Sequence, residues 1–146
     1  HRAEFALPVL ERNGVRPVIN DRYDDGMFSS LQAGVRALDP GRLGFFLLPV
    51  DVPLVRPGTL QALMGAFCAE RVDICRPCFR GRYGHPPLIA SARGPAIAAF
   101  DGPGGLRALL ARWRGRTADV AVEDPGILRD LDTWDDYEAM RNNLDS

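Results

Sequence analysis

The feature that most constrains this chain is an alternation of amphipathic helical stripes with short apolar runs. Apolar side chains recur with helical spacing in four stretches, at residues 3–13, 31–38, 60–67 and 106–113. Strand-like apolar runs lie beside them, at residues 15–19, 43–50, 72–76, 87–90 and 120–122. Thr133 and Asp136 resemble a capping box and predict a further helix at the C-terminus. This order predicts a βαβ arrangement, in which helices cover both faces of a parallel sheet.

The most apolar run, residues 43–50, lacks the alternation of a half-buried strand and predicts a central parallel strand. Pro49 cannot donate a ladder hydrogen bond, so this strand should end there. Asp51 follows directly and should lie at the carboxyl edge of the sheet, where open α/β sheets bind ligands. Its carboxylate, held between Pro49 and Pro53, suits a divalent cation. The alternative is that Asp51 only caps a turn or the next helix.

A second group of carboxylates lies near the C-terminus. Asp130 and Asp132 flank Leu131, so in extended backbone both face the same side. This pair could complete a Mg²⁺ site with Asp51. Asp135, in contrast, belongs in the first turn of a helix, where its charge favours the helix dipole.

Glycine-rich segments supply the other candidate sites. Gly26 precedes Ser29 and Ser30 at the start of a helix, where free N–H groups bind an anion or a base edge. The alternative is that these serines only cap the helix. Residues 80–87 combine arginines, glycines and a histidine, a composition that suits phosphate recognition or a solvated loop. Residues 101–105 offer another anion-binding helix start.

Composition excludes several classes of protein. The 146 residues suffice for one domain, and a net charge of −1 excludes a polybasic nucleic-acid binder. All 18 basic residues are arginines, so a Schiff-base or P-loop lysine cannot lie within these residues. No apolar run approaches the roughly 20 residues of a membrane span. Cys75 and Cys78 form a lone C-x-x-C, which we interpret as structural, with a thiol oxidoreductase as the alternative.

Five motifs occur in an order that resembles the MobA-like nucleotidyltransferases, closest to the molybdenum-cofactor cytidylyltransferases. Residues 20–34 are similar to the family's N-x-x-x-x-x-G-M-x-x-S-L-x-x-G segment. Residues 49–55 resemble its G-D-x-P-L-V metal-binding turn, with Pro49 in place of the usual glycine. Residues 80–86, 104–110 and 130–137 resemble its R-x-G-H-P, G-x-R-x-L-L and D-x-D-T-x-x-D blocks.

The resemblance implies a Rossmann-like α/β fold, of the nucleotide-diphospho-sugar-transferase type, with a mostly parallel sheet flanked by helices. It implies Mg²⁺-dependent transfer of CMP or GMP from CTP or another NTP to a phosphorylated acceptor such as molybdopterin, with release of pyrophosphate. Such a protein would be cytoplasmic and would bind neither nucleic acid nor membrane. The implied catalytic residue is Asp51, which would hold Mg²⁺ together with Asp130. The implied nucleotide-binding residues are Gly26, Met27, Ser29 and Ser30. The implied acceptor-binding residues are Arg82, Gly84, His85, Pro86 and Gly105.

The chain departs from the family pattern at its start. The family's first strand and its L-A-A-G-x-S-x-R-M-G-x-x-K loop, which wraps the triphosphate and supplies a lysine, do not occur in these residues. We therefore expect residues 1–146 to be one nucleotidyltransferase-like domain that lacks about two βα units, on the order of 60 residues, and is inactive as given. The alternative is a non-catalytic remnant that binds a nucleotide or a partner.

Overall fold

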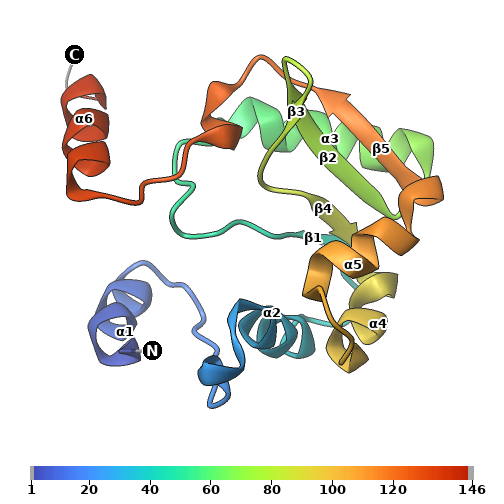
Figure 1. The fold of residues 1–146 in the computed structure, drawn as a ribbon, viewed down its shortest axis with the longest axis horizontal. Coiled ribbons are helices and arrows are strands. Elements are labelled where there is room, and N and C mark those ends of the chain that lie inside the picture. Colours follow the sequence, from blue (N-terminus) through green and yellow to red (C-terminus); the bar gives the residue numbers. More distant parts are fainter. Residues whose placement is uncertain (1, 145–146) are drawn as a thin grey trace. The chain divides into compact units, whose positions relative to one another are not determined.

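The computed structural model describes residues 2–144, which form two compact units (Figure 1). The first unit comprises His1–Arg42 and Ala92–Arg112, and the second comprises Leu43–Ser91 and Trp113–Ser146. Within residues 2–144, no helix combines the length and the apolar character needed to cross a membrane.

The second unit contains the sheet. Its strands are β1 (Gly44–Phe46), β2 (Ile74–Phe79), β3 (Arg82–Tyr83), β4 (Leu88–Ala90) and β5 (Thr117–Ala121). β2 pairs in parallel with β5 along one edge and antiparallel with β4 and β3 along the other, while β1 pairs antiparallel with β4. The predicted α/β class, with a sheet flanked by helices, is therefore confirmed.

The described strand pairings are mostly antiparallel, which differs from the mostly parallel sheet that we predicted. The strands pair antiparallel because the chain reverses its direction directly after β2. Arg80 and Gly81 both have positive φ values, of 49° and 78°, and turn the chain into the short strand β3. The chain then returns as β4 along the same edge of β2, and a strand that returns through so short a connection must run antiparallel.

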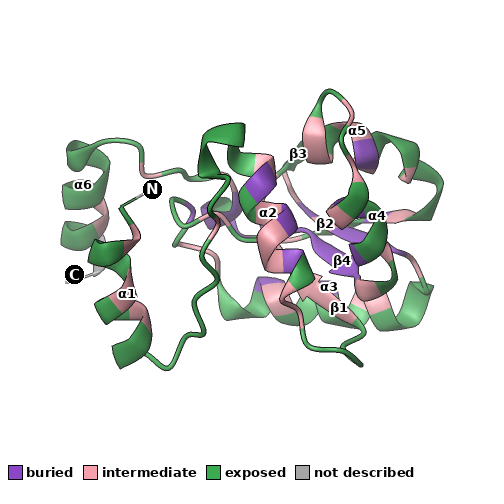
Figure 2. Cartoon of the chain, turned by 90° about the horizontal axis from the view of Figure 1, so that it is seen from below, coloured by how far each residue is buried: buried purple, intermediate pink, exposed green. Residues whose placement is uncertain are grey.

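Helix α3 (Pro57–Glu70) begins with Pro57 in its first turn, as predicted, and packs against β2, β4 and β5. The core beneath it consists of the buried side chains of Leu63, Cys75, Leu88 and Ala118. Figure 2 shows that β2 and β4 carry much of the buried surface of the sheet.

Two strand predictions are wrong. The run at residues 43–50 forms only the short β1, which pairs with β4 alone and whose residues are half-buried, so it is not a central parallel strand. Residues 15–19 form no strand, and Val15, Val18 and Ile19 are exposed. The described part of the first unit contains no other strand with which they could pair.

The first unit is helical. It contains α1 (Ala3–Arg12), the 3-10 turn η1 (Tyr23–Asp25), α2 (Met27–Arg36), α4 (Gly94–Ala99) and α5 (Gly105–Arg112). α2 packs against α4, where Val35 lies against Gly94 and Ile97 is fully buried. α1 has the predicted bounds to within one residue and contributes no buried side chain to the unit.

Three 3-10 turns and a helix complete the chain. They are η2 (Ser91–Arg93), η3 (Arg114–Arg116), η4 (Pro125–Leu128) and α6 (Trp134–Leu144). The predicted capping box of α6 is confirmed, because the Thr133 N–H donates to Asp136 Oδ2 at 2.9 Å and the Asp136 N–H donates to Thr133 Oγ1 at 3.2 Å. Hydrogen bonds from the Thr133 hydroxyl and backbone hold the pKa of Asp136 below its usual value.

The turn η4 is held by the buried carboxylate of Asp124, which is 2% exposed. Its Oδ2 accepts from the Thr59 hydroxyl at 2.6 Å and from the Arg56 N–H at 2.8 Å, and its Oδ1 accepts from the Gly126 N–H at 2.9 Å. Burial alone would raise the pKa of Asp124, but these hydrogen bonds and the nearby Arg56 guanidinium lower it overall. One carboxylate thus links η4 to the start of α3.

Asp124→Ala is expected to lower the free energy of unfolding by about 3 kcal/mol, because it leaves buried donors on Arg56, Thr59 and Gly126 without an acceptor. Urea unfolding followed by circular dichroism measures this loss. Asp132→Ala, at an exposed carboxylate, is the control and should change stability by less than about 0.5 kcal/mol. Equal effects of the two substitutions would contradict the structural role of Asp124.

The lowered pKa of Asp124 also predicts a pH dependence. As the pH falls, the Asp124 carboxylate is protonated at a higher pH in the unfolded chain than in the folded chain. The full contribution of Asp124 to the free energy of unfolding is therefore present above about pH 4. It is lost as the pH falls through the lower pKa of the folded state. Unfolding curves measured from pH 7 downward should therefore converge for the native protein and Asp124→Asn in acid. Parallel pH profiles would contradict this assignment.

Candidate functional site

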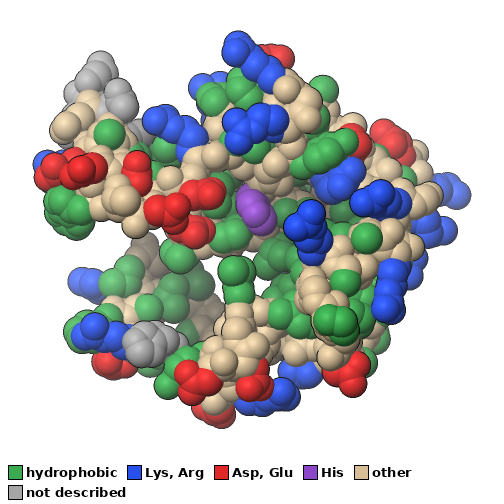
Figure 3. All heavy atoms as spheres, in the orientation of Figure 1, with side chains coloured by type: hydrophobic (Ala, Val, Ile, Leu, Met, Phe, Trp, Pro, Cys, Tyr) green, Lys and Arg blue, Asp and Glu red, His purple; other side chains and the backbone are tan. Residues whose placement is uncertain are grey.

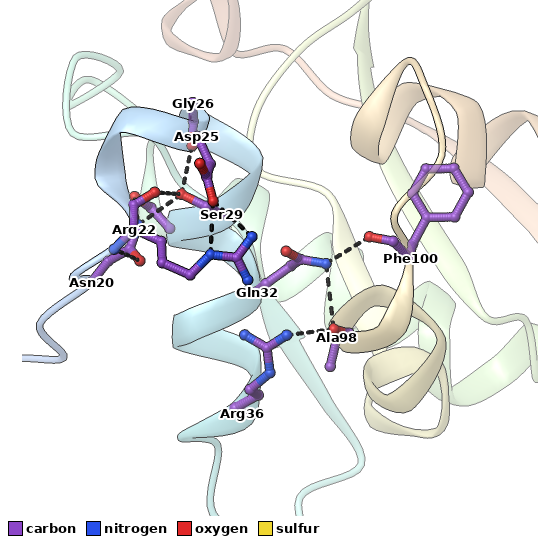
Figure 4. A network of polar contacts seen from close by, with 10 residues as sticks. Asn20, Arg22, Asp25, Gly26, Ser29, Gln32, Arg36, Ala98 and Phe100 are labelled. Carbon is purple, nitrogen blue, oxygen red and sulfur yellow. Dashed lines mark hydrogen bonds and ion pairs between the residues drawn. The ribbon is translucent and has the colours of Figure 1, made fainter.

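The start of α2 carries a polar network that includes three of the four predicted nucleotide-binding residues, of which Figure 4 labels Gly26 and Ser29. Gly26 precedes the helix with a φ of 93°, a value that favours glycine. The buried Ser29 hydroxyl lies 2.7 Å from the Arg22 carbonyl and 2.8 Å from the Gly26 carbonyl. Asn20 Nδ2 donates to Ser29 Oγ at 2.8 Å and to Ser30 Oγ at 2.9 Å. No side chain caps this helix, so the alternative of simple serine capping is wrong.

The other predicted nucleotide-binding residues lie differently. Ser30 is exposed and joins the network only through Asn20. Met27 is 85% exposed and is absent from the lining of the cavity described below. The polar network thus connects Asn20, Gly26, Ser29 and Ser30, while Met27 lies outside it.

A cavity of about 540 Å³ opens beside this network in the first unit. Ser29 and Phe28 of α2 line it, together with Phe100 from the loop after α4 and Gly105 at the start of α5. The structure therefore brings Ser29, which we assigned to the nucleotide, together with Gly105, which we assigned to the acceptor. The other predicted acceptor residues belong to the second unit.

Gln32 also lines this cavity and was missed by the sequence analysis. It is 9% exposed, and its Nε2 donates to the carbonyl oxygens of Phe100 at 2.8 Å, Ile97 at 3.0 Å and Ala98 at 3.3 Å. The available signal was its position, three residues after Ser29 and three before Val35, on the buried stripe of α2. A polar side chain on such a stripe needs buried partners.

In the second unit, a backbone hydrogen bond holds together the two segments that carry Asp51 and Asp130. The Leu131 N–H donates to the Asp51 carbonyl at 2.8 Å. Leu131 is half-buried, whereas Asp51, Asp130 and Asp132 are exposed. The carboxylates of Asp51 and Asp130 form no hydrogen bond or ion pair with any residue in the range 2–144. They therefore remain available to a ligand.

The chemistry of this pair fits a hard divalent cation. Mg²⁺ is commonly held by one or two carboxylates, with water and substrate phosphates supplying the other oxygens. No group of three or more His, Cys, Asp or Glu side chains that could hold a metal occurs among the described residues, so a site made of protein ligands alone is not formed there. Figure 3 shows acidic side chains gathered over α6 and the loop that leads into it.

The predicted acceptor segment is held close to η4. A side-chain carbon on Gly84 would lie 2.1 Å from the Ile127 carbonyl oxygen, so only glycine fits there. The His85 N–H donates to the same carbonyl at 2.9 Å. Arg82 is exposed on β3, and Pro86 is buried. His85 is half-buried, and its Nδ1 has no hydrogen-bond partner among the described residues.

The cysteines favour the structural interpretation over the thiol oxidoreductase. Cys75 and Cys78 both lie on β2, where a spacing of three residues directs their side chains to opposite faces of the sheet. Burial, together with the nearby Glu70 carboxylate, raises the pKa of Cys75 to about 11, so its thiol stays protonated and unreactive at neutral pH.

Comparison with known proteins gives matches to one family. A model of the MobA-like NTP transferase domain matches residues 2–119. The purine catabolism protein PucB of Bacillus subtilis (strain 168) is 27% identical over 144 residues, which cover 97% of this chain and 68% of PucB.

Solved mycobacterial structures share the fold. Rv0371c from Mycobacterium tuberculosis H37Rv superposes with a TM-score of 0.63 and 28% identity over 82% of this chain. A homologue from Mycobacterium sp. strain JC1 gives a TM-score of 0.64 at 24% identity over 79% of this chain, which concerns the fold alone. The chain spans 57% of the JC1 homologue and 60% of Rv0371c. The family model and these likenesses agree with the order of motifs, and the chain belongs to the MobA-like NTP transferase family.

Proposed function

We propose that this protein is a divalent-cation-dependent nucleotidyltransferase. It would transfer CMP or GMP from an NTP to a phosphorylated small-molecule acceptor of the molybdopterin type and release pyrophosphate. Membership of an NTP transferase family supports the reaction class. A crystal structure of Rv0371c in complex with manganese, with a TM-score of 0.61 and 28% identity over 80% of this chain and 60% of that chain, supports the use of a divalent cation.

The observation that carries this proposal is the hydrogen bond from the Leu131 N–H to the Asp51 carbonyl. It joins two acidic segments that are distant in sequence, since Leu131 lies 80 residues after Asp51. The carboxylates of Asp51 and Asp130 are exposed and have no partner within residues 2–144. The two proposed metal ligands therefore come from segments that the fold itself holds together.

In this proposal, Asp51 and Asp130 hold the cation. When bound, a divalent cation neutralises charge on the triphosphate and on the departing pyrophosphate. Gly26, Met27, Ser29 and Ser30 contact the nucleotide base. On the acceptor side, Arg82 contributes a guanidinium that can bind phosphate, and Gly84, His85 and Pro86 shape the backbone around the acceptor. Gly105, the remaining residue proposed for the acceptor, lines the cavity of the first unit.

Asp51→Asn and Asp130→Asn are each expected to weaken Mn²⁺ binding at least about tenfold, because each replaces an anionic ligand by a neutral one. Relaxation of water protons by bound Mn²⁺ measures the binding directly and does not depend on turnover. Asp135→Asn, an exposed acidic residue in the first turn of α6, is the matched control. Unchanged Mn²⁺ affinity in both variants would contradict the metal assignment.

Ser29→Ala is expected to weaken CTP binding about fivefold, because it removes the hydroxyl that joins Asn20 to the backbone before α2. Calorimetry measures this affinity, and the unfolding temperature is recorded alongside. Ser91→Ala is a matched control, because the buried Ser91 hydroxyl has no partner among the described residues. CTP affinity equal in all three proteins would argue against a nucleotide site at α2. CTP binding without pyrophosphate release in the presence of acceptor would favour the non-catalytic remnant.

A further inference from the structure

The cavity in the first unit presents one fixed hydrogen-bond acceptor, the side-chain oxygen of Gln32. The amide nitrogen of Gln32 faces three backbone carbonyls, those of Ile97, Ala98 and Phe100. Because carbonyl oxygens only accept hydrogen bonds, the NH₂ group must occupy that side. Figure 4 shows the Gln32 nitrogen directed at the Ala98 and Phe100 carbonyls and the oxygen directed away from them.

The described part of the chain offers the side-chain oxygen of Gln32 no hydrogen-bond donor. This oxygen accepts no hydrogen bond from any residue in the range 2–144, although the side chain is nine-tenths buried and lines the cavity. The fully buried side-chain atoms that lack a partner among the described residues are His85 Nδ1 and Ser91 Oγ, so the Gln32 oxygen is open to the cavity, where a ligand can supply the donor. Asp101 also lines the cavity, is exposed and has no partner in the described part of the chain, which adds a second acceptor.

Aromatic rings supply the apolar part of the cavity. Phe28 and Phe100 both line it and meet edge to face, with their ring centroids 6.0 Å apart. Glycines leave room for these rings, since a side-chain carbon on Gly102 would lie 2.8 Å from the Phe100 ring and one on Gly105 would lie 3.4 Å from Phe28. Both rings are half-buried, and the Arg112 guanidinium lies over the Phe100 ring, 5.2 Å from its centroid. Aromatic rings beside fixed polar groups suit a flat heterocyclic ring.

The charges of the cavity suit a ligand with a phosphate. Arg22 pairs with Asp25 at 2.7 Å, so their charges offset each other. Arg36 donates to the Ala98 carbonyl at 2.6 Å and has no carboxylate partner among residues 2–144. Its remaining N–H groups can therefore bind an anionic group of the ligand.

We propose that this cavity binds a planar nitrogen heterocycle bearing an amino group, and that Gln32 Oε1 accepts a hydrogen bond from that amino group. Gln32 is then a specificity-determining residue that favours amino-substituted rings over rings that lack the group. The proposal rests on the proposed function, because that reaction supplies the two candidate rings. They are the base of the nucleotide and the pterin of the acceptor. Both rings offer the same donor chemistry, and the experiment distinguishes them.

The test compares ligands that differ only in the amino group. Calorimetry measures the Kd of CMP and of the ribonucleotide of pyrimidin-2-one, in which hydrogen replaces the 4-amino group. A second pair is pterin and pteridin-4-one. We expect the amino-bearing member of at least one pair to bind about fivefold or more tightly, as for one buried hydrogen bond. Its binding should also shift the NMR signal of the Gln32 side-chain amide, identified by its absence in Gln32→Met.

Substitutions localise the effect. Gln32→Met should remove the difference within the pair, whereas Gln61→Met, the same change at an exposed position of α3, should leave it intact. The comparison of ligands on the native protein stands even if Gln32→Met does not fold. A difference in affinity within the pterin pair alone would support the proposal. It would also indicate that this cavity binds the pterin of the acceptor and that the nucleotide base binds at another site. Equal affinities within both pairs, no binding at all, or an unshifted Gln32 signal would overturn it. Mn²⁺ binding that still depends on Asp51 would then leave the proposed function in place.

Discussion

The fold of the second unit depends most on the hydrogen bonds that the buried carboxylate of Asp124 accepts. This carboxylate accepts three hydrogen bonds from inside the protein and so joins the start of α3 to η4. η4 makes two backbone contacts that leave no room for a side chain. A side-chain carbon on Gly126, within the turn, would lie 2.1 Å from the Leu54 carbonyl oxygen, and one on Gly84 would lie 2.1 Å from the Ile127 carbonyl oxygen of the turn. Two of the candidate segments are positioned by this turn directly, because the His85 N–H donates to the Ile127 carbonyl and Asp130 follows the turn two residues after Leu128. The Asp51 segment is held next to them by the hydrogen bond from the Leu131 N–H to the Asp51 carbonyl.

The first unit is organised around a different buried polar group, the amide of Gln32. Its donor end ties α2 to the end of α4 and the loop that follows. In both units a buried polar side chain with several backbone partners links elements distant in sequence. Such a link constrains backbone positions more tightly than apolar packing, because hydrogen bonds require particular distances and directions. The candidate binding residues lie beside these two links.

The local features of the chain were predictable to different extents. Periodicity predicted α1, Pro57 marked the start of α3, and the pair Thr133 and Asp136 predicted the capping box of α6. These features were predictable because their stabilising contacts lie within a few residues. The strand predicted at residues 15–19 failed because a strand needs a partner, and residue type does not supply one. Asp51 was indicated by its predicted place after an apolar strand, and Asp130 by its spacing from Asp132 and by the resemblance to the family. Gln32 was not indicated, because its partners lie more than 60 residues further along the chain.

By itself, the sequence determined the family, most of the helices and the residue types available for chemistry, because these depend on local spacing and on the order of motifs. Only the tertiary structure decided that the described strands pair mostly antiparallel, that Gly84 serves a close backbone contact, and that Asp124 is a buried link rather than part of an acidic site. Each of these outcomes depends on which distant backbone groups approach one another. Hydrogen-bond geometry and excluded volume in the folded chain, and not the pattern of side chains, set that approach.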